Sequence, residues 1–554
     1  MPPRAPAKHL RHALLLVLPG ATLLAQDHPI PYPGAVVKVE QLTGDLDRPR
    51  GIATRSRTGE RFGLGATDLG SCFEHDGKLW FLFGDSAGRP HARDAIAWTE
   101  SERPEDLLLE MPLAEDGLWA PLTVEGIRQG AFEIPSHGIS VRGKAYAVFT
   151  TDHSRSVVMG RSVFTVQDRD DPARFDPLWD LSTSHFINVA LATAERSDFP
   201  GLPASHELLI WGSGKYRRSS VRLACISESR VEERSELRYL KQVDAKGKPS
   251  WSPKEEDATP LFDHDQVGEL SVAWIEPLKR WLMLYNSESP RGIVMRTAER
   301  PWGPWTEARV LFNPDRDHGY GHFMHASHVP RRLDNFHDPD QPEKWGAEYG
   351  PYLIPRFTRG DEDRCSVFFT MSTWNPYQVV IMRADLGYPD RLGEREKVTK
   401  VMAPDDDEWT VHGNFLQSIE RNERPHWSTY AQWGDANRGV AHLPLIGSAD
   451  GALEFTVHGG HAEIVLVQET EAPPEAIPLT ELSAFHAALK SGAHGTVVEC
   501  IRGPDSNELD VEVRWSLNRF AGQTLRLYVI DSNIGRWGFI SFSDFRLVEW
   551  RPGE

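Results

Sequence analysis

The chain contains 554 residues, of which 40% are hydrophobic and 25% are charged, and its formal net charge at pH 7 is −19. These values are typical of a globular protein with two or three domains and a large core. The acidic balance argues against a nucleic-acid backbone as the partner, because such binding needs clustered Lys and Arg. A neutral substrate fits this composition better.

The N-terminus is typical of a secretory signal peptide. Basic residues among the first eleven positions precede two short apolar runs, at residues 13–18 and 21–25. This order predicts a signal peptide that spans residues 1–25, and therefore a secreted or periplasmic protein. No later segment approaches the ~20 uninterrupted apolar residues of a membrane-spanning helix, so we expect no stable membrane insertion.

Residues 66–86 predict a β-hairpin that carries two carboxylates. The dipeptide Asp76-Gly77 suits a type I′ turn, which needs positive φ at both central residues. Counting outward from this turn gives three pairs of directly opposed residues: His75 with Lys78, Phe73 with Trp80, and Asp68 with Asp85. Opposed residues have Cβ atoms about 4.5 to 5.5 Å apart, and like charges there destabilise a sheet. The acidic pair therefore indicates a functional site; the alternative is that one Asp caps a turn and the other binds backbone amides.

Residues 63–386 predict an all-β domain. Short runs rich in Val, Ile, Phe, Tyr and Trp alternate with turns of Gly, Pro, Asp and Ser, and helical periodicity is nearly absent. Five times, a polar segment leads into an apolar strand that two further strands follow. This repeat predicts a five-bladed β-propeller over residues 42–388, in which the starts of the innermost strands converge on one mouth of a central channel.

Residues 405–554 predict a second all-β domain, a β-sandwich, with one candidate helix at residues 480–489. The charged segment 389–404 is predicted to be a linker packed between the two domains. The four cysteines lack metal-type CxxC spacing, which leaves buried thiols or one long-range bridge, and we predict buried thiols. They are Cys72, Cys225, Cys365 and Cys500.

The motifs of the first domain resemble those of a known family. They are Thr67-Asp68-Leu69-Gly70 with Phe83-Gly84-Asp85, and the segments at residues 349–356 and 371–377. Together they resemble the secreted domain-of-unknown-function family 4185. The resemblance covers residues 42–386 and implies a five-bladed propeller related to arabinanase-type glycosidases. Some members of that family are endo-D-arabinanases that act on bacterial cell-wall arabinan.

The second domain is similar to the lectin-like β-sandwich, a jelly roll, that follows the propeller in levanase- and invertase-type enzymes. The motifs are Val457-His458-Gly459-Gly460-His461, Ile530-Asp531 and Trp537-Gly538-Phe539-Ile540. The sequence departs from that module at Phe539, where His is more usual. The expected fold class is therefore all-β, with a five-bladed β-propeller followed by a β-sandwich.

The resemblance also implies roles for three carboxylates. Asp68 would be the nucleophile or base, and Asp85 would be its partner. Arabinanase-type propellers also take a general acid from the start of another blade's inner strand, a place that Glu269 occupies here. Repulsion between the two Asp residues should raise one pKa, which leaves a proton donor beside an ionised partner. The structural alternative for Glu269 is a carboxylate that binds backbone amides.

Seven further residues lie near predicted strand ends, where side chains could bind sugar hydroxyls or stack on a sugar ring. They are His137, Asn188, His325, Tyr352, Arg356, Trp374 and Asn375. His322, His325 and His328 are spaced by three residues, which in an extended segment points successive side chains to opposite faces. We therefore predict no metal and no cofactor. A structural calcium ion stays an alternative, although no EF-hand-like loop supports it.

These observations predict a secreted glycoside hydrolase that acts as a monomer on a polysaccharide or cell-wall glycan. The resemblance alone implies an arabinofuranosidic, D-arabinan-like substrate. One alternative is a propeller that binds glycan without cleaving it, in which the acidic pair holds an ion or a hydrogen-bond network. The other is a sialidase, which would need an Arg cluster and a Tyr nucleophile where the strand starts supply mainly acids and amides.

Overall fold

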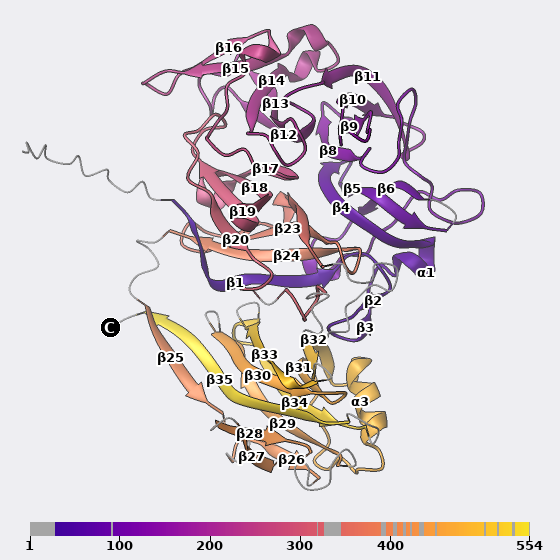
Figure 1. Cartoon of the computed structure of the whole chain (residues 1–554), viewed down its shortest axis with the longest axis vertical. Coiled ribbons are helices and arrows are strands. Elements are labelled where there is room, and N and C mark those ends of the chain that lie inside the picture. The colour runs from indigo at the N-terminus through magenta and orange to yellow at the C-terminus, as the bar shows by residue number, and fades with distance from the viewer. Residues whose placement is uncertain are drawn as a thin grey trace, which may run out of the picture.

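The computed structural model describes residues 28–89, 92–317, 319–325, 345–388, 395–402, 407–413, 417–421, 424–430, 437–448, 451–503, 506–517, 520–533 and 538–552. The expected signal peptide lies outside these ranges. The described chain is mainly strand, arranged in two bodies that are stacked along the long axis of the molecule (Figure 1). Within the described ranges, no helix is long and apolar enough to cross a membrane.

Five mainly antiparallel sheets form the first body. Blade one holds β4 (Leu64–His75), β5 (Lys78–Gly88) and β6 (Ala92–Thr99). Blade two holds β7 (Thr123–Val124), β8 (Pro135–Val141), β9 (Lys144–Thr151), β10 (Arg161–Gln167) and β11 (Arg174–Ser182). Blade three holds β12 (Asn188–Glu195), β13 (His206–Ser213), β14 (Arg222–Ser227), β15 (Arg238–Val243) and β16 (Pro249–Ser252). Blade four holds β17 (Leu270–Ile275), β18 (Arg280–Glu288), β19 (Arg291–Ala298) and β20 (Arg309–Phe312). Blade five holds β1 (Ile30–Gln41), β21 (Glu348–Leu353), β22 (Arg359–Gly360), β23 (Cys365–Thr373) and β24 (Gln378–Gly387).

The innermost strands form a closed ring. β4, β8, β12, β17 and β21 each contact the next, and β21 returns to contact β4. This topology confirms the predicted five-bladed propeller. β1 closes the ring, because it pairs antiparallel with β24 as the outer strand of blade five. The expected propeller start at residue 42 is therefore wrong, since β1 precedes it.

Apolar side chains between neighbouring blades form the propeller core. Phe81 and Phe83 of blade one pack with Phe368 of blade five in one such cluster. The inner parts of the blades are covered on both faces, so residues 208–211 of β13 are fully buried and form a continuous apolar run. All four cysteines are buried free thiols, which confirms the prediction made from their spacing.

The second body is a β-sandwich of two sheets. One sheet holds β25 (Arg395–Val401), β27 (Gln417–Arg421), β28 (Arg424–Ser428), β30 (Gly451–Gly459), β33 (Ser506–Ser516) and β35 (Ile540–Pro552). The other holds β26 (Thr410–His412), β29 (Gly439–Ile446), β31 (Glu463–Glu469), β32 (Gly495–Arg502) and β34 (Thr524–Asp531). Phe455 and Leu527 meet in the core between the sheets. Helix α3 (Leu482–Lys490) packs on the second sheet, close to the expected helix.

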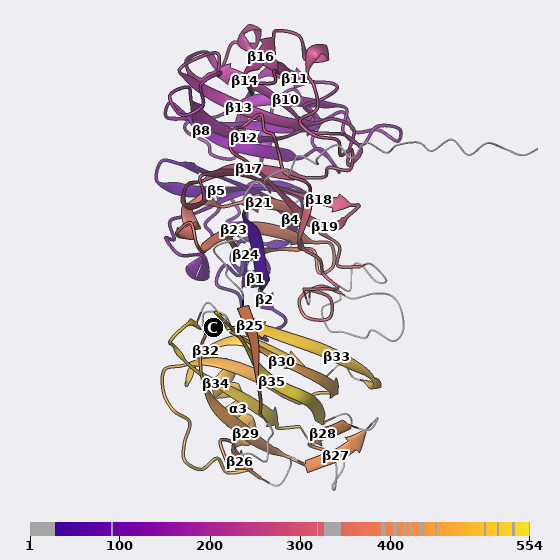
Figure 2. The same cartoon turned by 90° about the vertical axis from the view of Figure 1, so that its left-hand side faces the viewer.

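β25 lies inside the segment expected to be a linker, residues 389–404. It pairs with β35 over its whole length. Residues 395–401 are therefore a strand of the sandwich, and the prediction that they belong to a linker is wrong. α1 (Thr58–Phe62), β2 (Leu46–Asp47) and β3 (Ile52–Ala53) follow β1, and β2 lies at the boundary between the two bodies (Figure 2). Arg50 crosses this boundary, because its Nε donates to the carbonyl oxygen of Val498 at 3.1 Å.

Candidate active site

The hairpin of blade one forms at the predicted turn. Asp76 and Gly77 have positive φ angles of 49° and 76°. His75 opposes Lys78, and Phe73 opposes Trp80, so the first two predicted pairs are confirmed.

The predicted third pair is wrong, because the register changes between the turn and the carboxylates. Asp68 opposes Gly84 rather than Asp85. Leu69 and Gly70 both adopt left-handed conformations, with φ of 64° and 80°, and the extra residue forms a bulge that shifts the pairing by one position. Bulges of this kind re-aim side chains, and here the bulge separates the two carboxylates from direct opposition.

Asp68 is buried and is held by two tyrosines of blade five. Its Oδ2 accepts hydrogen bonds from the hydroxyls of Tyr349 (2.9 Å) and Tyr377 (2.6 Å), whereas its buried Oδ1 has no partner among the described residues. Burial raises the pKa of Asp68 well above its ordinary value, and the charge of Asp85 raises it further. A Cβ at Gly84, which lies opposite, would be 2.7 Å from the Leu69 side chain and 2.8 Å from that of Ile134, so a larger residue there would displace these side chains.

Asp85 is more open to solvent and is held in a strained conformation. Its φ is 39°, a region that non-glycine residues rarely adopt. Its carboxylate accepts the backbone N–H of Phe132, with distances of 3.2 and 3.3 Å to the two oxygens. Burial raises the pKa of Asp85 as well.

Asp94 of β6 is a third carboxylate that sequence reasoning missed. Its Oδ1 accepts the backbone N–H of Asp85 at 3.2 Å. Asp94 is buried, and burial raises its pKa well above the ordinary value, with the charge of Asp85 as the second cause. The signal in the sequence was slight: a single carboxylate directly before the apolar run at residues 95–98. Asp94 thus fixes the backbone that carries Asp85.

Glu269 lies directly before β17 and is paired with an arginine. Nη2 of Arg217 lies 3.1 and 3.0 Å from the two carboxylate oxygens of Glu269. The Arg217 guanidinium also lies 4.9 Å from the ring centre of Tyr216 and 5.6 Å from that of Tyr349. This ion pair holds the Glu269 carboxylate in a fixed position. Sequence reasoning missed Arg217, because its partner is distant in the chain.

Three of the predicted sugar-binding residues lie around the acidic pair. Tyr352 is fully buried, and among the described residues its hydroxyl has no hydrogen-bond partner. Burial raises its pKa, and the charges of Glu269 and Asp68 raise it further. The His137 ring lies 6.2 Å from that of Tyr352, and burial lowers its pKa to about 4, so the imidazole is neutral at pH 7. Trp374 is 38% exposed.

The structure gives the other predicted residues different surroundings. Arg356 donates to Glu74 Oε2 (3.1 Å) and to the carbonyl of Gly77 (3.0 Å) at the hairpin turn. Glu74 is six residues along β4 from Asp68, about 20 Å at the rise of an extended strand, so the structure does not bring Arg356 to the acidic pair.

Asn188, His325 and Asn375 take part in bonds within the fold. Asn188 Oδ1 accepts from the Ser136 hydroxyl (2.8 Å), and Nδ2 donates to the carbonyl of Gly268 (3.1 Å), so it links blades two, three and four. The backbone N–H of His325 donates to the carbonyl of Asn375 at 2.8 Å, and Asn375 is fully buried. His328, the third member of the histidine group, lies outside the described residues.

Exposed aromatic rings surround the acidic pair. Phe132, whose N–H binds Asp85, is 39% exposed and stacks on the ring of His153 at 5.0 Å. Trp374 packs edge-on against Tyr377 at 5.2 Å, and Tyr377 in turn binds Asp68. Such rings offer apolar faces beside carboxylates, a combination that suits sugar rings with their hydroxyls.

Among the residues that the structure describes, no three His, Cys, Asp or Glu side chains are grouped as a metal site requires. The expectation that no cofactor is needed stays a prediction.

The chain is similar to several characterised proteins. Among solved structures, the exo-β-1,3-galactanase of Phanerochaete chrysosporium is 7% identical, with 94% of this chain and 100% of that chain covered and a TM-score of 0.39. The endo-arabinase of Bacteroides thetaiotaomicron is 10% identical, with 59% and 96% covered and a TM-score of 0.32. Notoamide biosynthesis cluster protein J′ of Aspergillus versicolor is 25% identical in an alignment of length 321 that covers 51% of this chain and 83% of that protein.

One family model covers most of the propeller. The model described as Domain of unknown function (DUF4185) matches residues 53–383. The match includes the hairpin of blade one, all of blades two to four, and nearly all of β21 to β24. It confirms the resemblance seen in the sequence motifs, and because it spans more than half of the chain, this protein belongs to the DUF4185 family.

Proposed function

We propose that this protein is a glycoside hydrolase whose reacting groups are Asp68 and Asp85. The observation that carries the proposal is that both carboxyls have raised pKa values, and that the charge of Asp85 is one cause of the shift at Asp68. Cleavage of a glycosidic bond needs one carboxylic acid and one carboxylate. Two carboxyls whose pKa values are raised to different extents supply this combination, because one keeps its proton when the other has lost it.

The surroundings of the two groups support a division of roles. Asp68 is the more deeply buried, and its pKa is raised further than that of Asp85, so it keeps its proton when Asp85 has lost one. We assign proton donation to the leaving oxygen to Asp68, and the role of base or nucleophile to Asp85. The family resemblance implies the reverse assignment, with Asp68 as the nucleophile or base and Asp85 as its partner. Substrates with good leaving groups distinguish the two assignments, because they need no proton donor.

The substrate that we propose is a polysaccharide outside the cell. The exposed rings of Phe132 and Trp374 support a sugar polymer, since each offers a face on which a ring can stack. The family resemblance supports an arabinofuranosidic, D-arabinan-like polymer in particular. The basic and apolar start of the sequence supports secretion.

Release of reducing sugar from D-arabinan, arabinogalactan and fructan tests the proposal. We expect the secreted protein to release sugar from at least one of these polymers, and a variant with both Asp68→Asn and Asp85→Asn to release none. Failure of the wild type on every polymer, with retained binding to one of them in an affinity gel, would instead support the non-catalytic glycan-binding alternative.

Glu269→Gln tests whether Glu269 is a positioning residue. We expect a loss of activity of about tenfold that is equal for polymers and for aryl glycosides, because the charge that holds Arg217 is removed while proton donation is untouched. Loss of a charged hydrogen-bond partner costs roughly 1 to 3 kcal/mol, so the melting temperature should fall. The matched control is Glu288→Gln, which breaks the exposed neighbouring pair with Arg218 (2.9 Å). A much larger loss on polymers than on aryl glycosides would make Glu269 the general acid after all.

Asp94 offers a test of how Asp85 is positioned. Asp94→Asn keeps an acceptor for the Asp85 N–H, so kcat should fall less than about threefold, whereas Asp94→Ala should lower it about tenfold or more.

The stability of the protein should also depend on Asp94. An Asp in the unfolded chain has a pKa of about 3.9, whereas burial raises the pKa of Asp94 in the folded protein. The wild type therefore loses stability as the pH rises above about 3.9. The difference in melting temperature, Asp94→Asn minus wild type, should therefore increase between pH 4 and pH 8. A pH-independent difference would contradict this account.

A further inference from the structure

Three polar side chains on the β-sandwich form a hydrogen-bonded chain that the proposed glycosidase does not use. His486 of α3 lies between Ser532, which directly follows β34, and Glu463, the first residue of β31. Its Nδ1 lies 3.0 Å from the Ser532 hydroxyl, and its Nε2 lies 3.0 Å from Glu463 Oε2. A serine, a histidine and a carboxylate in this order are the groups that activate a hydroxyl for attack on a carbonyl carbon.

The fold brings these residues together from three elements. β31 and β34 are neighbouring strands, and Glu463 lies opposite Ile530. Ser532 is two residues beyond Ile530, so its side chain lies on the same face of the sheet as that of Glu463. α3 packs on this face, which places His486 against both side chains.

The ionisation of Glu463 decides which nitrogen of His486 carries the hydrogen. Lys490 Nζ lies 2.8 Å from Glu463 Oε2. Burial opposes ionisation, but the hydrogen bond from His486 and the charge of Lys490 lower the pKa of Glu463 to about 2. An ionised carboxylate only accepts hydrogen bonds, so His486 Nε2 donates to it. Nδ1 of the neutral imidazole then accepts the hydrogen of the Ser532 hydroxyl, as a general base does.

Ser532 lies where a substrate can reach it. It is partly exposed, and the side chains of His486 and Glu463 are 16% and 20% exposed. Within the described part of the chain, the backbone N–H of Ser532 donates to no acceptor. The backbone N–H of a nucleophilic serine is one of the donors that stabilise the oxyanion of an acyl-transfer intermediate. The hydroxyl, its base and one oxyanion donor therefore meet at a position open to solvent.

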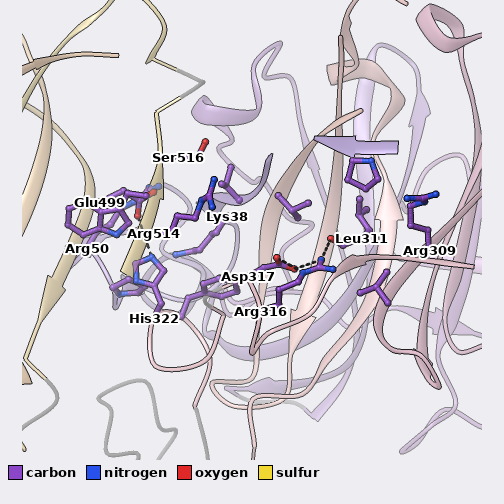
Figure 3. A pocket seen from close by; sticks show the side chains of 17 residues that line it. Lys38, Arg50, Arg309, Leu311, Arg316, Asp317, His322, Glu499, Arg514 and Ser516 are labelled. Carbon is purple, nitrogen blue, oxygen red and sulfur yellow. Dashed lines mark hydrogen bonds and ion pairs between the residues drawn. The ribbon is translucent and has the colours of Figure 1, made fainter. Parts of the chain in front are cut away.

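The attachment of α3 does not depend on Ser532. The apolar face of the helix packs into the core on this sheet. Its last residue, Lys490, also donates to the backbone carbonyl of Arg50 at 2.7 Å, at the boundary with the propeller. Figure 3 shows this boundary, where Arg50 lies beside Glu499 of β32. The helix is thus held by contacts that do not involve the Ser532 hydroxyl.

We propose that Ser532, His486 and Glu463 form a second hydrolytic site, which cleaves carboxylic esters. Ser532 Oγ attacks the acyl carbon and forms a new C–O bond, while its proton passes to His486 Nδ1. The bond between the acyl carbon and the alcohol oxygen breaks, and that oxygen takes the proton from Nδ1 as it leaves. Water, deprotonated by the same nitrogen, then cleaves the acyl–serine bond, which releases a carboxylic acid and restores Ser532. Glu463 is a positioning residue, because it holds the imidazole through Nε2.

Labelling of the full chain with a fluorophosphonate tests the site without any variant. The phosphorus reacts with a serine hydroxyl that a base activates, and fluoride leaves. We expect one phosphonyl adduct, which mass spectrometry of the digested protein should locate at Ser532. Absence of labelling, or adducts at other serines alone, would overturn the proposal.

Hydrolysis of p-nitrophenyl acetate measures the activity itself. We expect turnover by the wild type and a kcat at least about 100-fold lower in Ser532→Ala, because loss of a nucleophile of this kind removes most of the catalysis. The variant should fold, since it removes one partly exposed hydroxyl. The matched control is Ser491→Ala, which removes an exposed hydroxyl at the end of α3 and should keep the wild-type rate. Equal rates in the wild type and Ser532→Ala would contradict the assignment.

The two activities are separable. The double variant with Asp68→Asn and Asp85→Asn should hydrolyse the ester like the wild type, and Ser532→Ala should release reducing sugar from polymers like the wild type. Loss of ester hydrolysis in the Asp double variant would assign that activity to the propeller and overturn the site on the sandwich.

Discussion

Asp68→Asn is expected to lower the rate of polysaccharide hydrolysis by roughly 10² to 10⁴-fold, the range that loss of a general acid produces. The asparagine keeps a carbonyl oxygen for the hydroxyls of Tyr349 and Tyr377 but cannot give a proton to the leaving sugar. Because the shape of the site is kept, the loss should appear in kcat rather than in KM. Initial rates at saturating polymer measure it.

Aryl glycosides with good leaving groups make this prediction specific. They need little help from an acid, so Asp68→Asn should keep their rate within about tenfold of wild type. The control is Asp76→Asn, which changes an exposed carboxylate in the turn of the same hairpin and should leave all rates unchanged. An equal loss on both substrates would make Asp68 the base or nucleophile, and full activity on polymers would exclude it from the reaction.

The same variant should be more stable than the wild type at neutral pH. The folded pKa of Asp68 is raised, so the folded state binds the proton more tightly than the unfolded chain, whose Asp titrates near about 3.9. Stability of the wild type then falls as pH rises from that value toward the folded pKa. The melting temperature of Asp68→Asn should exceed that of the wild type at pH 7, and the difference should shrink toward pH 4.

Asp85→Asn is expected to cause the larger loss, about 10⁴-fold and similar on polymers and aryl glycosides. Asn can still accept the N–H of Phe132, but it is neither a base nor a nucleophile. Leaving-group quality does not matter for this step, so activated substrates should not rescue the variant.

Azide adds a second readout for Asp85. In Asp85→Ala the small anion can occupy the vacated space and attack the anomeric carbon, so azide should restore release of the aryl leaving group and form a glycosyl azide. A glycosyl azide with the configuration opposite to the wild-type product would assign Asp85 as the nucleophile of a retaining reaction, and one with the same configuration would assign it as the base of an inverting reaction. Activity of Asp85→Asn within tenfold of wild type on polymers would contradict the acidic pair altogether.

Local sequence patterns determined much of this protein. Asp76-Gly77 placed the hairpin turn, because only a few residues tolerate positive φ at both positions. Five repeats of short apolar strands predicted five blades, and the DUF4185 motifs named the family correctly. The repeats also marked which strands begin near the axis, where Asp68 and Glu269 lie. These features depend on residues that are close in the chain, so a pattern can reveal them.

Only the tertiary structure decided how the site is built. Tyr349 and Tyr377 lie 281 and 309 residues from Asp68 in the chain, and Arg217 lies 52 residues from Glu269, so no local pattern pairs them. β1 joins blade five from the other end of the chain for the same reason. The bulge at Leu69 and Gly70 shifts the register so that Asp68 lies opposite Gly84. Counting residues outward from the turn assumes regular pairing and cannot detect this bulge. Blade closure and strand register are set by packing across the whole ring. They place Asp94 where it binds the backbone N–H of Asp85, and they place Arg356 beside Glu74, at the opposite end of β4 from Asp68.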